Sequence, residues 1–367
     1  MYFKELELKN FRNYDHQSVK FHEKVNIIIG NNAQGKTNLL ESLFVTSLGK
    51  SFRTNNDGDM ILFGKDAAKV KAVSVRDDWD ITVELTFFSG RKEIRIDGDK
   101  KKKNIELLEN NYIVIFSPED LKIVKDEPEK RRRFIDREIC QLKPVYYRNL
   151  VRYKKILSHR NALLKQERID ENSLFIWNDE LVEYGSRVMM DRLDFINKLN
   201  IISKEIHKNI TAGNEELNLY YGADIDIKET LDDQKRVFSD KLSSRRGLDL
   251  TRRTTTCGPH KDDLKIFIND IDIRSFGSQG QQRTAALSLK LAELNLIFEE
   301  TGVKPVLLLD DVLSELDISR QKFLINSFKD VQIFITTTEI QDILNDSISD
   351  CYIFSIENGH ISNIDVK

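Results

Sequence analysis

Gly30-Asn31-Asn32-Ala33-Gln34-Gly35-Lys36-Thr37 is the segment of this 367-residue chain from which its fold class can be predicted. The residues before it, Val25–Ile29, form a short β-branched run that predicts a buried strand. The residues after it, Asn38–Phe44, show the apolar spacing of an amphipathic helix. Strand, glycine-containing loop and helix in this order predict a phosphate-binding P-loop, and with it an α/β fold.

Each residue type in this loop has a physical reason to be there. Gly30 and Gly35 allow the backbone to turn so that successive N–H groups face inward, and the N-terminus of the following helix adds partial positive charge. Lys36 is expected to reach the β- and γ-phosphates of a nucleoside triphosphate, while Thr37 holds Mg²⁺. All eight residues are therefore predicted to contact the nucleotide, and Lys36 is also predicted to have a catalytic role.

A second motif lies far along the chain, at Val306-Leu307-Leu308-Leu309-Asp310-Asp311. It predicts a buried parallel strand that ends in two carboxylates, as in a Walker B segment. Asp310 is expected to ligate Mg²⁺, and Asp311 to orient or deprotonate the attacking water. The alternative is that two acidic residues merely end a strand at a solvated turn, and the P-loop makes that alternative the weaker one.

Between these motifs, the segment Phe276–Arg283 places a serine and two glycines before the helical run Thr284–Leu294. A serine hydroxyl, backbone N–H groups and a helix N-terminus all favour an anion, so Ser278, Gly280 and Gln281 are candidates for a second phosphate cradle. One chain rarely needs two cradles for a γ-phosphate. We therefore expect two copies to meet head to tail, each offering its catalytic serine to the other's nucleotide. The alternative is an ordinary N-capped helix.

The composition fits a protein of the cytoplasm. Hydrophobic residues make up 40% of the chain, enough for a core, and the apolar runs are too short for a membrane span. Residues 1–7 alternate charged and apolar side chains and contain no hydrophobic region of a signal peptide. The three cysteines, Cys140, Cys257 and Cys351, form no CxxC pair and are expected to be buried and reduced.

The net charge of −3, from 57 basic and 60 acidic residues, does not by itself indicate nucleic acid. Local basic clusters are more informative, although any single cluster is more often a solvated face. The clusters lie at Lys50 with Arg53, Lys100–Lys103, Lys130–Arg133, and Arg245–Arg246 with Arg252–Arg253. The sequence has no helix-turn-helix, zinc finger or aromatic RNA-binding motif. We therefore expect DNA binding through backbone phosphates, and the candidate contacts are Lys50, Arg53, Arg131, Arg132 and Arg133.

The periodicities divide the chain into three segments. Strand-like alternation dominates residues 1–128, around the P-loop helix. Residues 129–249 show helical spacing, including one long amphipathic helix between Leu174 and Ile206. In residues 250–367 the sheet is expected to resume with a hairpin turn at Asn269-Asp270. The prediction is a mixed-sheet core that is discontinuous in sequence and carries an inserted helical domain.

The order of these motifs resembles the ABC-type ATPases. Ser278–Gln282 is similar to their signature motif, and Ser314-Glu315-Leu316-Asp317 is similar to their D-loop. A more specific resemblance, which spans essentially the whole chain, is to the RecF family of bacterial recombination mediators. It is carried by five further segments: Leu8–Tyr14, Gly49–Thr54, Phe116–Leu121, Arg131–Asp136 and Gly258–Asp263.

The RecF resemblance implies an ABC-type P-loop ATPase that binds ATP and Mg²⁺ and forms a homodimer around two nucleotides. It also implies a clamp on double-stranded and single-stranded DNA at gapped junctions, in recombinational repair and replication-fork restart. The implied enzyme activity is a weak, DNA-stimulated ATPase whose turnover releases DNA. The implied protein partners are RecR and, indirectly, RecO.

Two residues depart from the usual ABC pattern. Asp311 stands where glutamate usually follows the Walker B aspartate, and its side chain is one methylene shorter. Thr337 stands where transporters often have a histidine that contacts the γ-phosphate, and a hydroxyl carries no positive charge. Both changes predict slow hydrolysis, which suits a switch. The strand end Ile115–Pro118 offers no glutamine for a Q-loop.

Two other classes of protein share this chemistry. The ATPase subunit of an ABC transporter is the main alternative, but the large insert and the basic clusters argue against it. Chromosome-organising proteins and Rad50 separate the same motifs with coiled coils of many heptads. Residues 129–249 are too few for such a coiled coil and lack sustained heptads.

Overall fold

The computed structural model describes residues 1–327, 331–338 and 350–366. Its contacts divide the chain into a first unit, Met1–Lys122 with Lys290–Lys367, and a second unit, Ile123–Leu289. These boundaries differ from those expected at 128/129 and 249/250. Among the described residues, no helix is long and apolar enough to cross a membrane. All three cysteines are buried, as expected.

The strand before the P-loop, β3 (Val25–Ile29), lies inside a six-stranded sheet with the order β15-β14-β3-β13-β12-β8. The other strands come from distant parts of the chain: β8 (Ile113–Phe116), β12 (Val306–Asp310), β13 (Ile333–Thr337), β14 (Cys351–Glu357) and β15 (His360–Val366). Every neighbouring pair is parallel except β14 and β15, which form an antiparallel hairpin at the edge. Parallel strands are buried on both faces, which explains apolar runs such as Val306–Leu309.

Parallel pairing brings the ends of three strands to one edge of this sheet. β13 lies between β3 and β12, with Thr337 in register with Ile29 and Thr336 in register with Asp310. The P-loop leaves β3 at the same edge at which β12 ends. Ligands of open α/β sheets bind at the carboxyl ends of the strands, so this edge is the place to look for a site.

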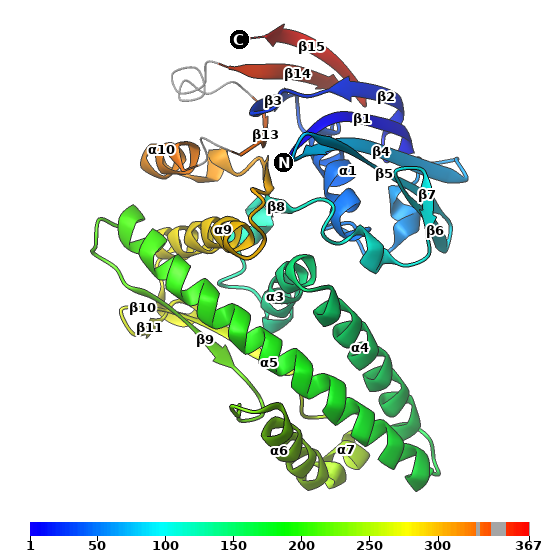
Figure 1. Cartoon of the computed structure of the whole chain (residues 1–367). Helices are drawn as coiled ribbons and strands as arrows, with labels where there is room; N and C mark the ends of the chain where they lie inside the picture. Colours follow the sequence, from blue (N-terminus) through cyan, green and yellow to red (C-terminus); the bar gives the residue numbers. More distant parts are fainter. Residues whose placement is uncertain (328–330, 339–349, 367) are drawn as a thin grey trace. The chain divides into compact units, whose positions relative to one another are not determined.

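Helix α1 (Lys36–Leu48) begins directly after the P-loop and packs between this sheet and a second, antiparallel one (Figure 1). The second sheet has the order β2-β1-β4-β5-β6-β7. Its strands are β1 (Tyr2–Phe11), β2 (Tyr14–Lys20), β4 (Ala67–Arg76), β5 (Trp79–Phe88), β6 (Arg91–Ile96) and β7 (Asp99–Lys101). Every α1 residue from Leu39 onward is buried, as expected for a helix that is covered on two sides. Short helices complete the first unit: η1 (Asp57–Met60), η2 (Asn104–Leu107), α2 (Pro118–Leu121), η3 (Leu313–Glu315) and α10 (Ile318–Asn326).

The second unit is mainly helical. It contains α3 (Pro128–Leu142), α4 (Pro144–Leu164), α5 (Glu171–Ile210), α6 (Leu231–Ser244) and α7 (Arg246–Arg252). α5 is the long amphipathic helix that the sequence predicted, and it forms an antiparallel hairpin with α4 (Figure 1). α6 packs closely on α5 at Gly185, where an added Cβ would lie 2.4 Å from Phe238 Cε1.

A three-stranded antiparallel sheet, β11-β10-β9, completes the second unit. It is formed by β9 (Leu217–Gly222), β10 (Asp263–Ile268) and β11 (Ile271–Asp272), and left-handed backbone at Asn269 and Asp270 forms the predicted hairpin turn. The sequence analysis assigned β10 and β11 to the resumed core sheet, and their hydrogen bonds correct this assignment. They pair with each other and with β9, which packs against α5. α8 (Ile273–Phe276) and α9 (Gln279–Thr301) then lead back to the first unit.

Candidate nucleotide site

The turn between β1 and β2 holds one side of the P-loop. Gly35 has a left-handed φ of +122°, and an added Cβ would lie 2.7 Å from the Asn13 side chain, so this position requires glycine. The Tyr14 hydroxyl donates to the Gly35 carbonyl over 2.9 Å, and Asn13 Nδ2 donates to the Gln34 carbonyl over 2.8 Å. The Leu8–Tyr14 segment, to which the sequence assigned no role, therefore shapes the loop.

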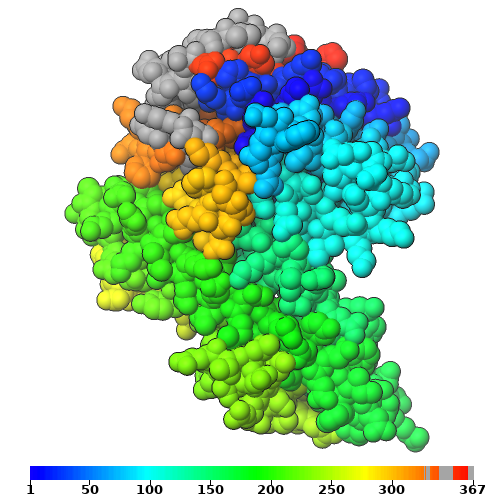
Figure 2. Space-filling model, in the orientation of Figure 1, coloured from blue at the N-terminus to red at the C-terminus, as the bar shows by residue number. Residues whose placement is uncertain are grey.

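The β14–β15 hairpin holds the loop from another direction. Asn358 N donates to Gln34 Oε1 over 2.6 Å, and Gly359 N donates to the Gln34 carbonyl over 3.0 Å. At the start of the loop, a Cβ on Gly30 would lie 2.5 Å from the Ile356 carbonyl oxygen. The two ends of the chain thus lie side by side, as the blue and red surfaces show (Figure 2). Gln34, predicted to contact the nucleotide, uses its side chain to fix the loop.

Lys36 has a buried side chain with an exposed fraction of only 4%. Its Nζ donates to the Gly30 carbonyl over 2.7 Å and to the Asn31 carbonyl over 3.3 Å. The Asp311 carboxylate lies 4.0 Å from the same atom. The ammonium group is therefore held across the loop by contacts that phosphate oxygens can replace. Residues 31–33, in the middle of the loop, are exposed.

Asp310 joins the two motifs. Its Oδ1 accepts a hydrogen bond from the Thr37 hydroxyl over 2.9 Å and another from the Thr336 hydroxyl over 2.9 Å. Burial raises the pKa of Asp310, the two hydroxyl groups oppose this rise, and the charge of Asp311 adds to it. Sequence reasoning missed Thr336, although it stands in a run of three threonines. Only the sheet register shows that Thr336, rather than Thr337, lies opposite Asp310.

Asp311 follows β12 with a left-handed backbone, at a φ of +52°. Aspartate tolerates this conformation better than most residues do. Its N–H donates to Thr336 Oγ1 over 2.9 Å, which fixes the turn, and its side chain is 36% exposed. Thr337, the sequence candidate for a γ-phosphate contact, is buried at the end of β13 opposite Ile29.

The donor set fits a magnesium ion. The Thr37 hydroxyl and the Asp310 carboxylate are oxygen ligands that lie 2.9 Å apart. Mg²⁺ prefers oxygen ligands, and it usually takes one or two from the protein and the rest from phosphates and water. Because the pKa of Asp310 is raised, a proton competes with the metal for this carboxylate at acidic pH.

The predicted signature segment starts α9, and its first residues belong to the second unit. Ser278 is exposed and forms a reciprocal cap with Gln281: Ser278 N donates to Gln281 Oε1 over 2.9 Å, and Gln281 N donates to Ser278 Oγ over 3.2 Å. Gln281 Nε2 also donates to Glu215 Oε1 over 3.0 Å. His207 then bridges Glu215 Oε2, at 3.2 Å, and Ser288 Oγ further along α9, at 3.0 Å. The Gln281 side chain therefore positions this segment from within the second unit.

The basic residues predicted to contact DNA differ in how accessible they are. Lys50, Arg53 and Arg133 are exposed. Arg132 is partly buried and donates to the Asp262 carbonyl over 2.6 Å. Four of the five candidates therefore keep some accessible surface.

Arg131 is a correction to the predicted DNA contacts. Its side chain is only 2% exposed, and Nε and Nη2 donate to the two Asp263 carboxylate oxygens over 2.6 and 2.8 Å. Nη1 donates to the Asp126 carbonyl over 2.6 Å. A guanidinium that is buried and hydrogen-bonded on all three nitrogens does not reach a DNA phosphate. Its role is to attach α3 to β10.

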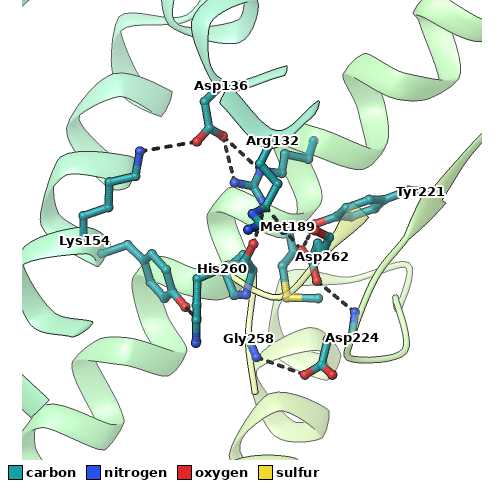
Figure 3. A network of polar contacts seen from close by, with 12 residues as sticks. Arg132, Asp136, Lys154, Met189, Tyr221, Asp224, Gly258, His260 and Asp262 are labelled. Atoms are coloured by element: carbon teal, nitrogen blue, oxygen red, sulfur yellow. Dashed lines mark hydrogen bonds and ion pairs between the residues drawn. The ribbon is translucent and has the colours of Figure 1, made fainter. Parts of the chain in front are cut away.

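Two segments that carry the RecF resemblance meet in a buried polar network of the second unit (Figure 3). Arg192 on α5 is 3% exposed and lies 2.8 Å from Asp136 and 3.4 Å from Asp262. Burial alone would raise the pKa of Asp136, but the charges of Arg192 and Lys154 hold it below its ordinary value. Burial raises the pKa of Asp262. Removal of one partner from this network would leave a buried charge without compensation, which is strongly destabilising.

Comparisons with known proteins identify the family of this chain. The family model described as RecF/RecN/SMC N terminal domain matches residues 2–362. A "DNA replication and repair protein RecF" of Clostridioides difficile (strain 630) is 46% identical over 367 residues, which are 100% of this chain and 99% of the relative. Two solved structures of the recombination mediator protein RecF in the RecFOR pathway, RecF-ATPrS and RecF-ATP, are each 38% identical, with TM-scores of 0.93 and 0.92. The match covers 99% of this chain and 98% of each of theirs. The predicted fold class is thereby confirmed, and this chain belongs to the RecF family, with an ABC-type P-loop ATPase core.

Proposed function

We propose that this protein is an ATP-dependent DNA clamp that acts in recombinational repair and replication-fork restart. The observation that carries the proposal is the contact of Thr37 and Thr336 with Asp310, beside the buried Lys36. Thr37 and Asp310 are 273 residues apart, yet together they form a site for a triphosphate and its metal. The RecF-ATP structure supports ATP as the nucleotide.

The residues of the site divide the work of ATP binding and hydrolysis. Lys36 exchanges its contacts with the Gly30 and Asn31 carbonyls for phosphate oxygens. Thr37 and Asp310 would hold Mg²⁺, and the ion would supply positive charge that neutralises the phosphates. Asp311 orients the attacking water. Its short side chain, and the neutral hydroxyl of Thr337 as the proposed γ-phosphate contact, make hydrolysis slow and suit a switch.

The signature segment supports an ATP-dependent homodimer as the working state. Ser278 and Gly280 lie at the start of α9, and Ser278 is exposed. In the dimer, each Ser278 contacts the γ-phosphate held by the other P-loop. The dimer clamps DNA, and DNA-stimulated hydrolysis releases it. Linkage then requires DNA to strengthen ATP-driven dimerisation as much as ATP strengthens DNA binding.

DNA and two proteins are the proposed partners. DNA contacts are assigned to Lys50, Arg53, Arg132 and Arg133, at junctions of double-stranded and single-stranded DNA in the cytoplasm. RecR is the proposed protein partner and RecO an indirect one, because the solved relatives are described as part of the RecFOR pathway.

Sedimentation with and without ATP, each in the presence and absence of gapped DNA, tests this proposal. The wild-type protein should become a dimer with ATP and should bind the gapped DNA more tightly in that state. Ser278→Arg should still bind ATP as a monomer, because its P-loop is unchanged. It should neither dimerise nor hydrolyse ATP, because the bulky side chain fills the cradle offered to the partner copy.

Mixing Ser278→Arg with Lys36→Ala sharpens the test. Lys36→Ala alone should lose tight ATP binding, since it lacks the positive charge between the phosphates. A heterodimer of the two variants contains one site with an intact P-loop and an intact signature segment, so some dimerisation or ATPase activity should return. A Ser278→Arg protein that dimerises and hydrolyses ATP normally on its own would rule out the shared site.

A further inference from the structure

Helix α4 has an unusual charge composition. It contains five basic residues and no acidic residue among its 21 positions; the basic residues are Arg148, Arg152, Lys154, Lys155 and Arg160. Its partner α5 carries seven acidic and five basic residues, so within this helical hairpin the excess of positive charge lies on α4. A solvated helix face normally mixes both signs.

Three of these cations have partners that come from other elements. Arg160 is 1% exposed and lies 2.8 Å from Asp249, so it serves the fold. Arg152 donates to both carboxylate oxygens of Glu180 over 2.7 and 2.9 Å. Lys154 lies 3.4 Å from Asp136. These pairs account for part of the positive charge but leave Arg148 and Lys155.

Arg148 and Lys155 are exposed, and no carboxylate of the described part of the chain lies within 4.0 Å of either. Seven residues separate them, so they lie on the same face of the helix, about 10 Å apart. Arg152 lies between them on this face, and His159 extends it by one turn. The α4 basic face consists of Arg148, Arg152, Lys155 and His159.

Neighbouring cations on one helix face destabilise the helix, because like charges at i,i+3 and i,i+4 repel each other. The pairs Arg148 with Arg152 and Arg152 with Lys155 have this spacing, and the Glu180 carboxylate on α5 offsets only the charge of Arg152. A single glutamate on the face would relieve the repulsion, yet α4 has none. A polyanion that lies along the face would remove the same repulsion. Binding of a polyanion would therefore account for the absence of acidic residues from α4.

The basic face continues toward the far end of the helical hairpin. The His159 ring stacks on Trp177, with centroids 5.0 Å apart and an interplanar angle of 12°. Trp177 packs on the apolar cluster of Leu163, Leu164 and Leu174, which Leu250 of α7 also contacts. This cluster brings α7, with the exposed Arg252 and Arg253, next to the end of α4.

We propose that the α4 basic face binds the phosphate backbone of duplex DNA. The inference rests on the proposed function and adds a contact surface to it. A straight, rigid helix face suits a regular backbone, whereas single strands are gripped by stacking on exposed aromatic rings. The one aromatic ring of this face, His159, is already stacked on Trp177. The occupant is therefore the duplex part of the DNA substrate.

The test compares two double variants of the full-length protein. Arg148→Gln/Lys155→Gln removes two charges from the basic face, and Arg236→Gln/Lys241→Gln removes two charges from α6 as a matched control. Fluorescence anisotropy with ATP and a labelled 40-base-pair duplex gives the affinity over a series of salt concentrations. The face variant should bind about tenfold more weakly near physiological salt, and its salt slope should fall by about 2, since each lost phosphate contact changes it by about 0.9.

The control variant should keep the wild-type affinity and slope. Arg148→Lys/Lys155→Arg should bind the duplex as tightly as the wild type, because the charge of the two side chains, rather than their geometry, determines the affinity. Both neutralised variants should retain wild-type ATP affinity by calorimetry and ATP-dependent dimerisation without DNA. Wild-type duplex affinity and salt slope in the face variant would overturn the inference and leave a protein partner as the occupant of the face. Failure of the wild-type protein to bind duplex DNA would instead overturn the proposed function.

Discussion

At the scale of single residues, the buried charge of Asp310 serves the proposed metal site but lowers the stability of the folded protein. Its carboxylate is buried, close to the charge of Asp311, and burial is the main reason for its raised pKa. Between the ordinary pKa and the raised one, the folded protein binds more protons at this site than the unfolded chain. Stability therefore falls as pH rises through this window, and at neutral pH the full cost of the buried charge is present. In the proposed function, Mg²⁺ binding at Asp310 offsets this cost.

Asp310→Asn should accordingly stabilise the nucleotide-free protein and impair catalysis. Asparagine keeps an oxygen that accepts from Thr37 and Thr336 but removes the charge. We expect the midpoint of thermal unfolding at pH 7.5 to rise, by about 2–4 °C for each kcal/mol recovered. Mg²⁺-dependent hydrolysis should fall more than nucleotide binding does. Scanning calorimetry and an ATPase assay check both parts, and hydrolysis at the wild-type rate would exclude Asp310 as the metal ligand.

At the scale of elements, the second unit depends on close contacts between helices. Gly185 on α5 allows α6 to approach, because an added Cβ would lie 2.4 Å from Phe238 Cε1 and 3.0 Å from Tyr153 Cε2. Gly247 on α7 has no heavy atom within 4 Å of the same position. The two helical glycines therefore differ in packing, and Gly247 also lies in the first turn of its helix.

Gly185→Ala should destabilise the second unit by about 1–3 kcal/mol, because the methyl group forces α5 and α6 apart. Gly247→Ala should be neutral or stabilising by up to about 1 kcal/mol, since alanine favours helix and meets no neighbour. Urea unfolding of the two variants measures the difference. Equal stabilities would show that the α5–α6 contact tolerates the added methyl group.

His260 lies in the loop between α7 and β10 and links this loop to α4. His260 Nε2 donates to the Thr255 carbonyl over 3.1 Å, so in the neutral ring Nδ1 accepts from the Tyr153 hydroxyl over 2.6 Å. A second proton on Nδ1 requires this hydroxyl to turn and accept instead. Burial lowers the pKa of His260 to about 4. The unfolded chain takes up the proton near pH 6.5, so stability is fully present above that pH and is lost as pH falls to about 4.

The stability of the second unit should drop by about 3 kcal/mol over this pH range because of His260 alone. His260→Gln should flatten this part of the profile, whatever its effect on stability at neutral pH. His16→Gln, at an exposed histidine, serves as the control and should leave the slope unchanged. Urea unfolding at a series of pH values from 7 to 4 gives the profiles. The prediction is wrong if the His260→Gln profile is as steep as that of the wild type.

At the scale of the whole molecule, the nucleotide loop depends on both ends of the chain. Gly359, in the β14–β15 turn, donates to the Gln34 carbonyl, and an added Cβ there would lie 2.2 Å from the Asn13 carbonyl oxygen. Gly90, in the β5–β6 turn, has a similar positive φ, +79° against +74°, but no neighbour within 4 Å. Substitution of either glycine strains the backbone. Only substitution of Gly359 also disturbs the P-loop.

Gly359→Ala should therefore weaken ATP binding, whereas Gly90→Ala should not. An overpacking cost of about 1–3 kcal/mol that acts on the loop corresponds to a loss of about tenfold in ATP affinity. Both variants should lose some thermal stability from the positive φ. Calorimetric titration with Mg·ATP separates the two effects. Equal ATP affinities in the two variants would mean that the hairpin does not control the loop.

Local chemistry made several parts of this protein predictable from the order of its residues. A glycine with positive φ, a lysine and a threonine at fixed spacing define the P-loop, because the loop conformation and the helix N-terminus arise within a few residues. The same holds for the strand that ends at Asp310, for the capped helix at Ser278 and for the turn at Asn269-Asp270. Together these segments, in order, were enough to predict the fold class and the family.

Which side chains meet became clear only from the folded chain. Thr336 rather than Thr337 lies opposite Asp310 because parallel strands from distant segments set the register. Arg131, in a basic run that reads as a DNA contact, is buried against Asp263, which is 132 residues away. The basic face of α4 is not a run in the sequence at all, since its cations are separated by the helical period and some are neutralised from other elements. Burial and pairing are long-range properties, and no local pattern of residues contains them.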